Sequence, residues 1–156
     1  MKLLIIGVGR VRTGYIREGI EGYLKRIRRY IPLNTVDIRE ERQTSGNPLT
    51  AVLKREGERV LSKIEKNDFV IVLHEAGTHL TSSGFAALIE RLLSGGKKRT
   101  CFIVGGAYGL HPSVFERADM ALSLSKMTLP HEVTRLVLIE QIYRAFTIIK
   151  GEPYSH

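Results

Sequence analysis

Two loops of this chain combine residue types that suit a small bound ligand. A short apolar run ends in Gly105-Gly106-Ala107-Tyr108-Gly109, and a second run, residues 121–124, ends in Ser125-Lys126-Met127-Thr128-Leu129-Pro130. Glycines lack a Cβ and let the backbone approach a ligand closely. Loops that leave the carboxyl ends of buried strands form the ligand crevice of α/β proteins. The two loops therefore predict a cofactor pocket.

The spacing of glycines and histidines excludes several other kinds of site. Gly7-Val8-Gly9 is followed by a glycine only at Gly14, too late for a dinucleotide fingerprint, and neither glycine loop continues into the Gly-Lys-Ser/Thr of a triphosphate loop. The five histidines are scattered without ligand spacing, so we expect no metal site. No Ser-His-Asp arrangement is legible. A largely apolar cofactor, held at its polar end by backbone groups, is the remaining interpretation.

The elements that must position these loops alternate along the whole chain. Apolar runs predict strands over residues 2–9, 33–38, 69–73, 100–104 and 121–124. Helical spacing of apolar residues predicts helices over 16–27, 48–64, 82–94, 112–118 and 131–149. Ser82 or Ser83 is the expected cap of the third helix. Strict alternation predicts an α/β domain with a mostly parallel sheet, and residues 40–48 read as a loop within it.

Length and composition favour one domain over residues 1–156. An apolar content of 43% is enough for a hydrophobic core. The single cysteine, Cys101, lies inside an apolar run and reads as a packed core thiol. The apolar run at the amino terminus is too short for a signal peptide, and no run is long enough to span a bilayer. We therefore expect a cytoplasmic protein without a membrane partner.

The positive charge is concentrated in the first half of the chain. The net charge is +8, and residues 1–67 carry fifteen Lys or Arg against eight Asp or Glu. Lys25-Arg26-Ile27-Arg28-Arg29 falls at the end of a predicted helix, where cations suit the helix dipole. Two interpretations stay open for this run: a solvated helix end, or a surface that contacts RNA or phosphate. A ligand crevice in the other half of the chain favours the second.

The last predicted helix carries apolar residues around well over half of its circumference. Such a helix is buried on more than one side. In a chain of 156 residues, we expect the second apolar side to meet another subunit in a two-fold dimer. Glu140 and Arg144 are four residues apart and predict an ion pair on this helix.

Several segments of the chain form a recognisable pattern, and the most specific are Phe102 to Leu110 and Leu122 to His131. The other segments are Met1-Lys2-Leu3, Leu73, Ser82 to Ala86, Arg135, Leu138, Glu140-Gln141, Tyr143-Arg144-Ala145 and Pro153-Tyr154. Together they closely resemble the RlmH (YbeA-like) family of the SPOUT methyltransferases, and the resemblance extends over effectively the whole chain.

The resemblance implies an activity and an assembly. The implied reaction transfers a methyl group from S-adenosylmethionine to N3 of a pseudouridine in 23S ribosomal RNA, within the large subunit or the assembled ribosome. It also implies a homodimer and a carboxyl-terminal trefoil knot that forms the cofactor pocket. The general expectation is against knots, so this feature follows from family likeness alone.

The resemblance also assigns residues. The implied cofactor contacts are Leu73, Gly105, Leu124, Ser125, Lys126, Met127, Thr128 and Leu129. Methyl transfer requires that the imide proton leave, and a nearby cation or hydrogen-bond partner favours the resulting anion. Candidates for this catalytic role are His131, Arg144, Tyr154 and His156, with Arg135 a further one. Tyr108 and Tyr154 are candidates to stack on an unpaired base.

The tail departs from the family pattern. Family members close with Tyr-His and a basic residue, whereas this chain ends Pro153-Tyr154-Ser155-His156. Ser155 stands at the position of the family histidine, which leaves the role of His156 open. Two other functions also stay open: a SPOUT methyltransferase acting on tRNA or another rRNA site, and a non-catalytic module that binds RNA or the ribosome. The module would leave the two loops without a ligand to explain them.

Overall fold

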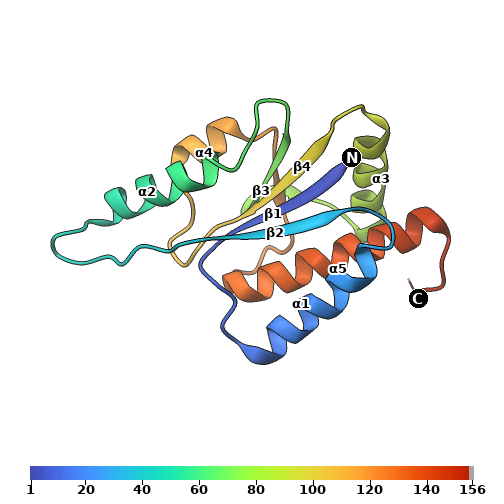
Figure 1. The fold of residues 1–156 in the computed structure, drawn as a ribbon, viewed down its shortest axis with the longest axis horizontal. Coiled ribbons are helices and arrows are strands. Elements are labelled where there is room, and N and C mark those ends of the chain that lie inside the picture. The colour runs from blue at the N-terminus through green and yellow to red at the C-terminus, as the bar shows by residue number, and fades with distance from the viewer. Residues whose placement is uncertain (155–156) are drawn as a thin grey trace.

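Five parallel strands form a central sheet in the order β2-β1-β4-β3-β5 (Figure 1). The computed structural model describes residues 1–154. The strands are β1 (Lys2–Val8), β2 (Leu33–Ile38), β3 (Phe69–His79), β4 (Arg99–Val104) and β5 (Met120–Ser123). The helices are α1 (Gly14–Ile27), α2 (Leu49–Leu61), α3 (Ser82–Ser94), α4 (Pro112–Arg117) and α5 (His131–Lys150). The expected parallel α/β sheet is confirmed, and the trefoil knot stays a prediction.

Helices cover both faces of the sheet, with α2 and α4 on one face and α1, α3 and α5 on the other (Figure 1). Side chains of a strand point alternately to the two faces. In β1, Leu3 and Ile5 pack in the cluster formed with α1, α3 and α5, whereas Leu4, Ile6 and Val8 pack in the cluster with α2 and α4. Burial on both faces explains why the strands read as continuous apolar runs.

Helix α5 lies between α1 and α3 on one face of the sheet. These neighbours and the sheet take up most of its apolar circumference, so the circumference alone does not require another subunit. Its second apolar side is half-buried within the chain. The half-buried apolar residues are Val133, Leu136, Val137, Tyr143, Ile148 and Ile149. The homodimer therefore stays a prediction.

Helix α3 begins at a cap that differs from the expected one. The cap of α3 is Thr81, whose hydroxyl oxygen accepts a hydrogen bond from the Gly84 N–H at 3.0 Å. The expectation that Ser82 or Ser83 caps this helix is therefore wrong. Ser82 instead lies in the first turn and donates to the Gln141 side chain of α5 at 2.8 Å. The preference of serine for caps does not distinguish it from an adjacent threonine with the same chemistry.

The start of α1 is capped by a residue from the far end of the chain. The Glu132 carboxylate on α5 accepts hydrogen bonds from the backbone N–H groups of Arg12 and Thr13, at 2.9 and 3.1 Å. The hydrogen bond from Arg12 is the largest cause that lowers the pKa of Glu132. A carboxylate at a helix amino terminus also complements the helix dipole. This contact fixes the amino ends of α1 and α5 side by side.

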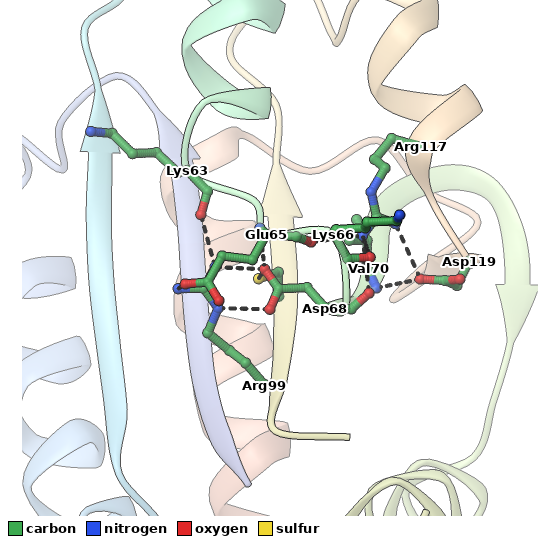
Figure 2. Close-up of polar contacts among 9 residues, drawn as sticks. Lys63, Glu65, Lys66, Asp68, Val70, Arg99, Arg117 and Asp119 are labelled. Atoms are coloured by element: carbon green, nitrogen blue, oxygen red, sulfur yellow. Dashed lines mark hydrogen bonds and ion pairs between the residues drawn. The ribbon is translucent and has the colours of Figure 1, made fainter. Parts of the chain in front are cut away.

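A network of charged groups closes the amino-terminal end of the sheet (Figure 2). Asp68 precedes β3, is 4% exposed, and accepts two hydrogen bonds from Arg99 of β4 at 2.6 and 2.9 Å. It also accepts from the Glu65 N–H at 2.7 Å. Burial raises the pKa of Asp68, but these hydrogen bonds outweigh burial, so that its pKa is lowered overall. The buried carboxylate is therefore held ionised by its partners.

Arg117 and Asp119 extend this amino-end network to β5. The Arg117 guanidinium donates to the backbone carbonyls of Glu65, Lys66 and Asp68, at 3.0 to 3.3 Å. The Asp119 carboxylate accepts from the Val70 N–H at 2.8 Å. Beside this network, burial raises the pKa of the Cys101 thiol to about 12, and the thiol donates to Asp68. Cys101 is therefore an unreactive core thiol, as expected.

Candidate functional site

A hollow of about 700 Å³ lies at the carboxyl-terminal end of β3, β4 and β5. Its walls come from Leu73 to Glu75 in the middle of β3, the glycine loop after β4, the loop after β5, and the first turn of α5. Most of the lining residues are glycines or have apolar side chains, and few have polar side chains. A cavity of this size with mostly apolar walls and a few polar groups is typical of small-molecule sites.

The glycine loop after β4 folds into a tight turn at the wall of the hollow. The Gly109 N–H donates to the Gly106 carbonyl at 3.1 Å, and Gly109 has φ +85°, a conformation that favours glycine. A Cβ at Gly105 would lie 3.0 Å from the Leu110 side chain and 3.1 Å from the Gly109 carbonyl oxygen. Glycine at position 105 is therefore needed for this turn to close, and the closed turn sets the shape of the wall.

The loop after β5 is ordered by its own serine. The Ser125 hydroxyl oxygen accepts from the Met127 N–H at 2.9 Å, and the Ser125 carbonyl accepts from Ser123 at 2.9 Å. The Thr128 hydroxyl donates to the Glu75 carboxylate at 3.2 Å. Glu75 lies in β3, so this bond connects the second loop to the strand on the other side of the hollow. The arrangement places one carboxylate at the wall of the hollow.

Strand β3 continues beyond Leu73, where the sequence pattern ended it. Its pairing with β5 is interrupted by a bulge between Leu73 and Thr78. A Cβ at Gly77 would lie 2.7 Å from backbone atoms of Ala121, so the bulge brings two backbones close together at a glycine. A bulge redirects the side chains of a strand. Here it directs His74 and Glu75 to the hollow.

Arg135 supports the adjoining end of β1 from behind the hollow. Its side chain is 4% exposed, and its guanidinium donates to the carbonyls of Val8 and Gly9 at 3.0 and 2.5 Å and to Asp37 at 2.8 Å. A Cβ at Gly7 would lie 2.1 Å from the guanidinium carbon. Burial lowers the pKa of Arg135 and Asp37 raises it, but arginine stays charged. Arg135 is thus a structural residue and does not face a ligand.

The structure brings most of the expected cofactor-binding residues together. Seven of the eight line the hollow, and Lys126 is exposed outside it. The seven are Leu73, Gly105, Leu124, Ser125, Met127, Thr128 and Leu129. The sequence reading missed His74, Glu75, Phe115 and Thr134, which also line it. The sequence did carry a signal for His74 and Glu75, because two ionisable residues directly follow the apolar run that ends at Leu73.

The expected catalytic residues fall into two groups at opposite ends of α5. His131 begins the helix and lines the hollow. Arg144 lies thirteen residues later on the same helix, which at 1.5 Å per residue is roughly 20 Å away. Tyr154 lies beside Arg144, whose guanidinium is 4.9 Å from the centre of the Tyr154 ring. His156 and Ser155 lie outside the described residues. One protomer therefore does not bring His131 and Tyr154 together.

Tyr154 belongs to a cluster of hydrogen-bonded side chains on α1 and α5. Its hydroxyl lies 3.2 Å from the Tyr23 hydroxyl and donates to Glu140 at 3.3 Å, while Arg144 pairs with Glu140 at 2.7 Å. Burial and these two partners raise the pKa of Tyr154 above its usual value. The phenol therefore stays neutral at pH 7 and acts as a hydrogen-bond donor rather than a proton acceptor.

The described residues offer neither a membrane span nor a metal site. Within residues 1–154, no helix is long and apolar enough to cross a membrane. The same residues contain no cluster of three or more His, Cys, Asp or Glu side chains that could hold a metal ion.

Comparison with known proteins connects this geometry to a family. A family model described as "Predicted SPOUT methyltransferase" matches residues 1–156. The "Ribosomal RNA large subunit methyltransferase H" of Syntrophotalea carbinolica is 45% identical over 156 residues, covering 100% of this chain and 99% of that protein. The proteins of that name from Carboxydothermus hydrogenoformans and Halothermothrix orenii are 45% and 44% identical, each over 99% of both chains. The chain therefore belongs to the SPOUT methyltransferase family.

Proposed function

We propose that this chain transfers a methyl group from S-adenosylmethionine to N3 of a pseudouridine in 23S ribosomal RNA. The observation that carries the proposal is the hollow that seven of the eight expected cofactor contacts share. The names of the relatives support a large-subunit rRNA substrate. The choice of pseudouridine N3 rests on the family resemblance. An rRNA substrate also agrees with a cytoplasmic location.

The lining of the hollow fits S-adenosylmethionine in its chemistry. Leu73, Leu124 and Leu129 offer apolar surface for the adenine ring, and the glycine loop offers backbone groups for polar edges. The Glu75 carboxylate, held by Thr128, suits the positive charge of a sulfonium or an amino group. When bound, the cofactor supplies a methyl group already activated as a sulfonium. The chain must then orient the target base, exclude water and stabilise the deprotonated imide.

His131 and the start of α5 suit the last of these tasks. The amino terminus of a helix carries a partial positive charge, and Glu132 faces α1. An imide nitrogen that loses its proton beside this end gains a favourable electrostatic interaction, which lowers the pKa of the imide. His131, at the wall of the hollow, adds a hydrogen-bonding ring. We assign His131 to orienting the base and stabilising its anion.

The separation of the catalytic residues supports a homodimer. His131 and the pair Arg144 and Tyr154 lie roughly 20 Å apart along α5. Two copies related by a two-fold axis, with their α5 helices antiparallel, bring the carboxyl end of one helix to the amino end of the other. In such a dimer, Arg144 and Tyr154 of each copy lie beside His131 of its partner. Half-buried apolar residues along α5 supply a surface for the contact.

The test is methylation of ribosomes purified from cells that lack this protein. The purified protein and labelled S-adenosylmethionine are expected to place one methyl group in 23S rRNA, at a pseudouridine identified by mass spectrometry. A methyl group on tRNA, or at another rRNA position, would replace the proposed substrate. Failure of the folded protein to bind S-adenosylmethionine in calorimetry would refute the whole proposal.

Two alanine variants of one loop test the placement of the cofactor. Leu129→Ala removes apolar surface from the hollow and is expected to weaken binding of S-adenosylmethionine by about tenfold, or about 1.4 kcal/mol. Lys126→Ala is the matched control, because Lys126 is exposed outside the hollow, and it is expected to bind as the wild type does. The reverse pattern would place the cofactor on the outer side of the loop.

A further inference from the structure

A second hollow, of about 1090 Å³, lies next to the first at the same end of the sheet. It is formed by the segment after β1, by the loop after β2, and by Tyr108 from the glycine loop. Four arginines and three carboxylates line it; they are Arg10, Arg12, Arg39, Arg42, Asp37, Glu40 and Glu41. We refer to this hollow as the arginine groove.

The carboxylates of the arginine groove are already paired. Asp37 accepts from the buried Arg135 at 2.8 Å, Glu40 pairs with Arg12 at 2.6 Å, and Glu41 pairs with Arg59 of α2. These pairs cancel the negative charges and use one of the four lining arginines. Arg10, Arg39 and Arg42 are exposed and make no ion pair within residues 1–154. Three unpaired guanidinium groups therefore remain to meet an anion.

The loop that carries Arg39 and Arg42 is braced before any ligand arrives. The Glu41 N–H donates to the buried Glu56 carboxylate at 2.8 Å, and Arg59 of α2 donates to the Arg39 carbonyl at 2.9 Å. Asn47 donates to the Arg42 carbonyl at 2.6 Å and accepts from Arg55 at 2.9 Å. A loop held in place loses less conformational entropy when it binds, so the contacts it makes contribute more affinity.

Tyr108 stands on the wall between the arginine groove and the cofactor hollow. Its neighbours in the glycine loop line the first hollow, while Tyr108 lines the groove and is 58% exposed. The two hollows also adjoin at Gly9, where a Cβ would lie 3.8 Å from the His131 ring. An exposed aromatic ring beside basic side chains suits an unpaired base flanked by phosphates.

Building on the proposed function, we propose that the arginine groove binds the RNA strand next to the target nucleotide. Arg10, Arg39 and Arg42 hold its phosphates, and Tyr108 stacks on a base adjacent to the one that enters the cofactor hollow. Guanidinium groups suit phosphate oxygens because they donate two parallel hydrogen bonds. The basic run from Lys25 to Arg29 is not part of this surface, because it lies where α1 ends, beside Tyr23, Tyr143 and the cluster around Tyr154.

The test compares two triple variants with equal loss of charge. Arg10→Gln, Arg39→Gln and Arg42→Gln together remove the free charges of the groove. Arg91→Gln, Lys97→Gln and Lys98→Gln remove three exposed charges near the end of α3, at the opposite end of the sheet. Binding of a single-stranded RNA with the target-loop sequence is measured at several salt concentrations. Calorimetry with S-adenosylmethionine and thermal unfolding are measured for both variants.

The groove variant is expected to bind the RNA at least tenfold more weakly than the wild type. Its slope of log affinity against log salt is expected to fall by about 2, since each phosphate contact on a single strand contributes about 0.7. The control variant is expected to lose less than threefold in affinity, and both variants should bind S-adenosylmethionine normally. Equal losses in the two variants would overturn the proposal.

The stacking role of Tyr108 has its own variants. Tyr108→Phe keeps the ring and is expected to bind RNA as the wild type does, whereas Tyr108→Ala is expected to lose about tenfold. If both variants bind the RNA equally well, Tyr108 is not part of the RNA-binding surface. The two proposals can fail separately. If the wild-type protein binds S-adenosylmethionine and methylates ribosomes, but the groove variant binds RNA as the control variant does, the groove proposal alone is refuted. If RNA binding depends on the groove but no methyl group is transferred, the proposed methyltransferase activity alone is refuted.

Discussion

The two ends of the sheet are built from different kinds of residue. At the amino end, Asp68, Arg99, Arg117 and Asp119 form hydrogen bonds with one another and with the backbone around them (Figure 2). At the carboxyl end, glycines, an unpaired set of arginines and two hollows stand open. The fold therefore separates stability from binding. Polar contacts at the amino end hold the strands together, which leaves the loops at the carboxyl end free to suit a ligand.

Removal of Asp68 is the strongest test of this separation. Asp68→Ala removes the buried acceptor of Arg99 and of the Glu65 N–H, while Arg99 keeps its contacts with the Glu65 carboxylate and the Lys63 carbonyl. Loss of one member of a buried ion pair costs about 3 kcal/mol. We expect that decrease in the free energy of unfolding, measured in urea. Affinity for S-adenosylmethionine, measured where the variant is folded, should match the wild type. A loss of affinity greater than threefold would show that the two ends are not independent.

Gly7→Ala tests a structural contact at the carboxyl end of the sheet. The new Cβ would lie 2.1 Å from the Arg135 guanidinium, which must then leave the carbonyls of Val8 and Gly9. We expect a loss of about 2 kcal/mol in unfolding free energy, because buried hydrogen bonds to a charged group are broken. Arg135→Ala in the same chain should make Gly7→Ala nearly neutral. Additive losses in the double variant would contradict the contact.

Gly105→Val tests the binding role of the carboxyl end. The added atoms collide with Leu110 and the Gly109 carbonyl and displace the wall of the cofactor hollow. We expect at least a tenfold loss of affinity for S-adenosylmethionine in calorimetry, with a change of about 1 kcal/mol or less in unfolding free energy, since the loop is at the surface. Full affinity in this variant would be evidence against the hollow as the cofactor site.

Glu132→Gln has the smallest expected effect and adds a dependence on pH. The pKa of Glu132 is lowered in the folded chain, so its contribution is present above the unfolded pKa of about 4.3 and is lost as pH falls through the folded value. At pH 7 we expect a loss of about 0.5 kcal/mol, as for a weakened helix cap. The difference from wild type should shrink below about pH 4, measured by urea unfolding across pH. A difference independent of pH would exclude the ionised cap.

Local patterns in the sequence were sufficient for the elements and for the two loops. Alternating apolar runs and glycine-rich turns depend on neighbouring residues, so the strands and the glycine loop could be located without a structure. The bulge in β3 could not be found in this way, because it is set by the approach of Gly77 to Ala121. For the same reason, the sequence pattern did not reveal that Glu132 caps α1 or that Asp68 binds Arg99.

The candidate catalytic residues show the same limit on a larger scale. His131, Arg144 and Tyr154 were grouped because all belong to the carboxyl-terminal segment. A straight helix keeps residues apart in proportion to their separation in sequence, and α5 places His131 far from the other two. The need for a second protomer to bring these residues together could be inferred only from the folded chain.

Arg135 has a consequence for how such chains diverge. The guanidinium occupies the space that any side chain at position 7 would need, and it holds the peptide at Gly9 that separates the two hollows. Any residue larger than glycine at position 7 forces the guanidinium away from the carbonyls that it binds, and without Arg135 position 7 no longer requires glycine. Among relatives, these two distant positions should be inherited as a pair, and lineages that have replaced one are expected to have replaced both.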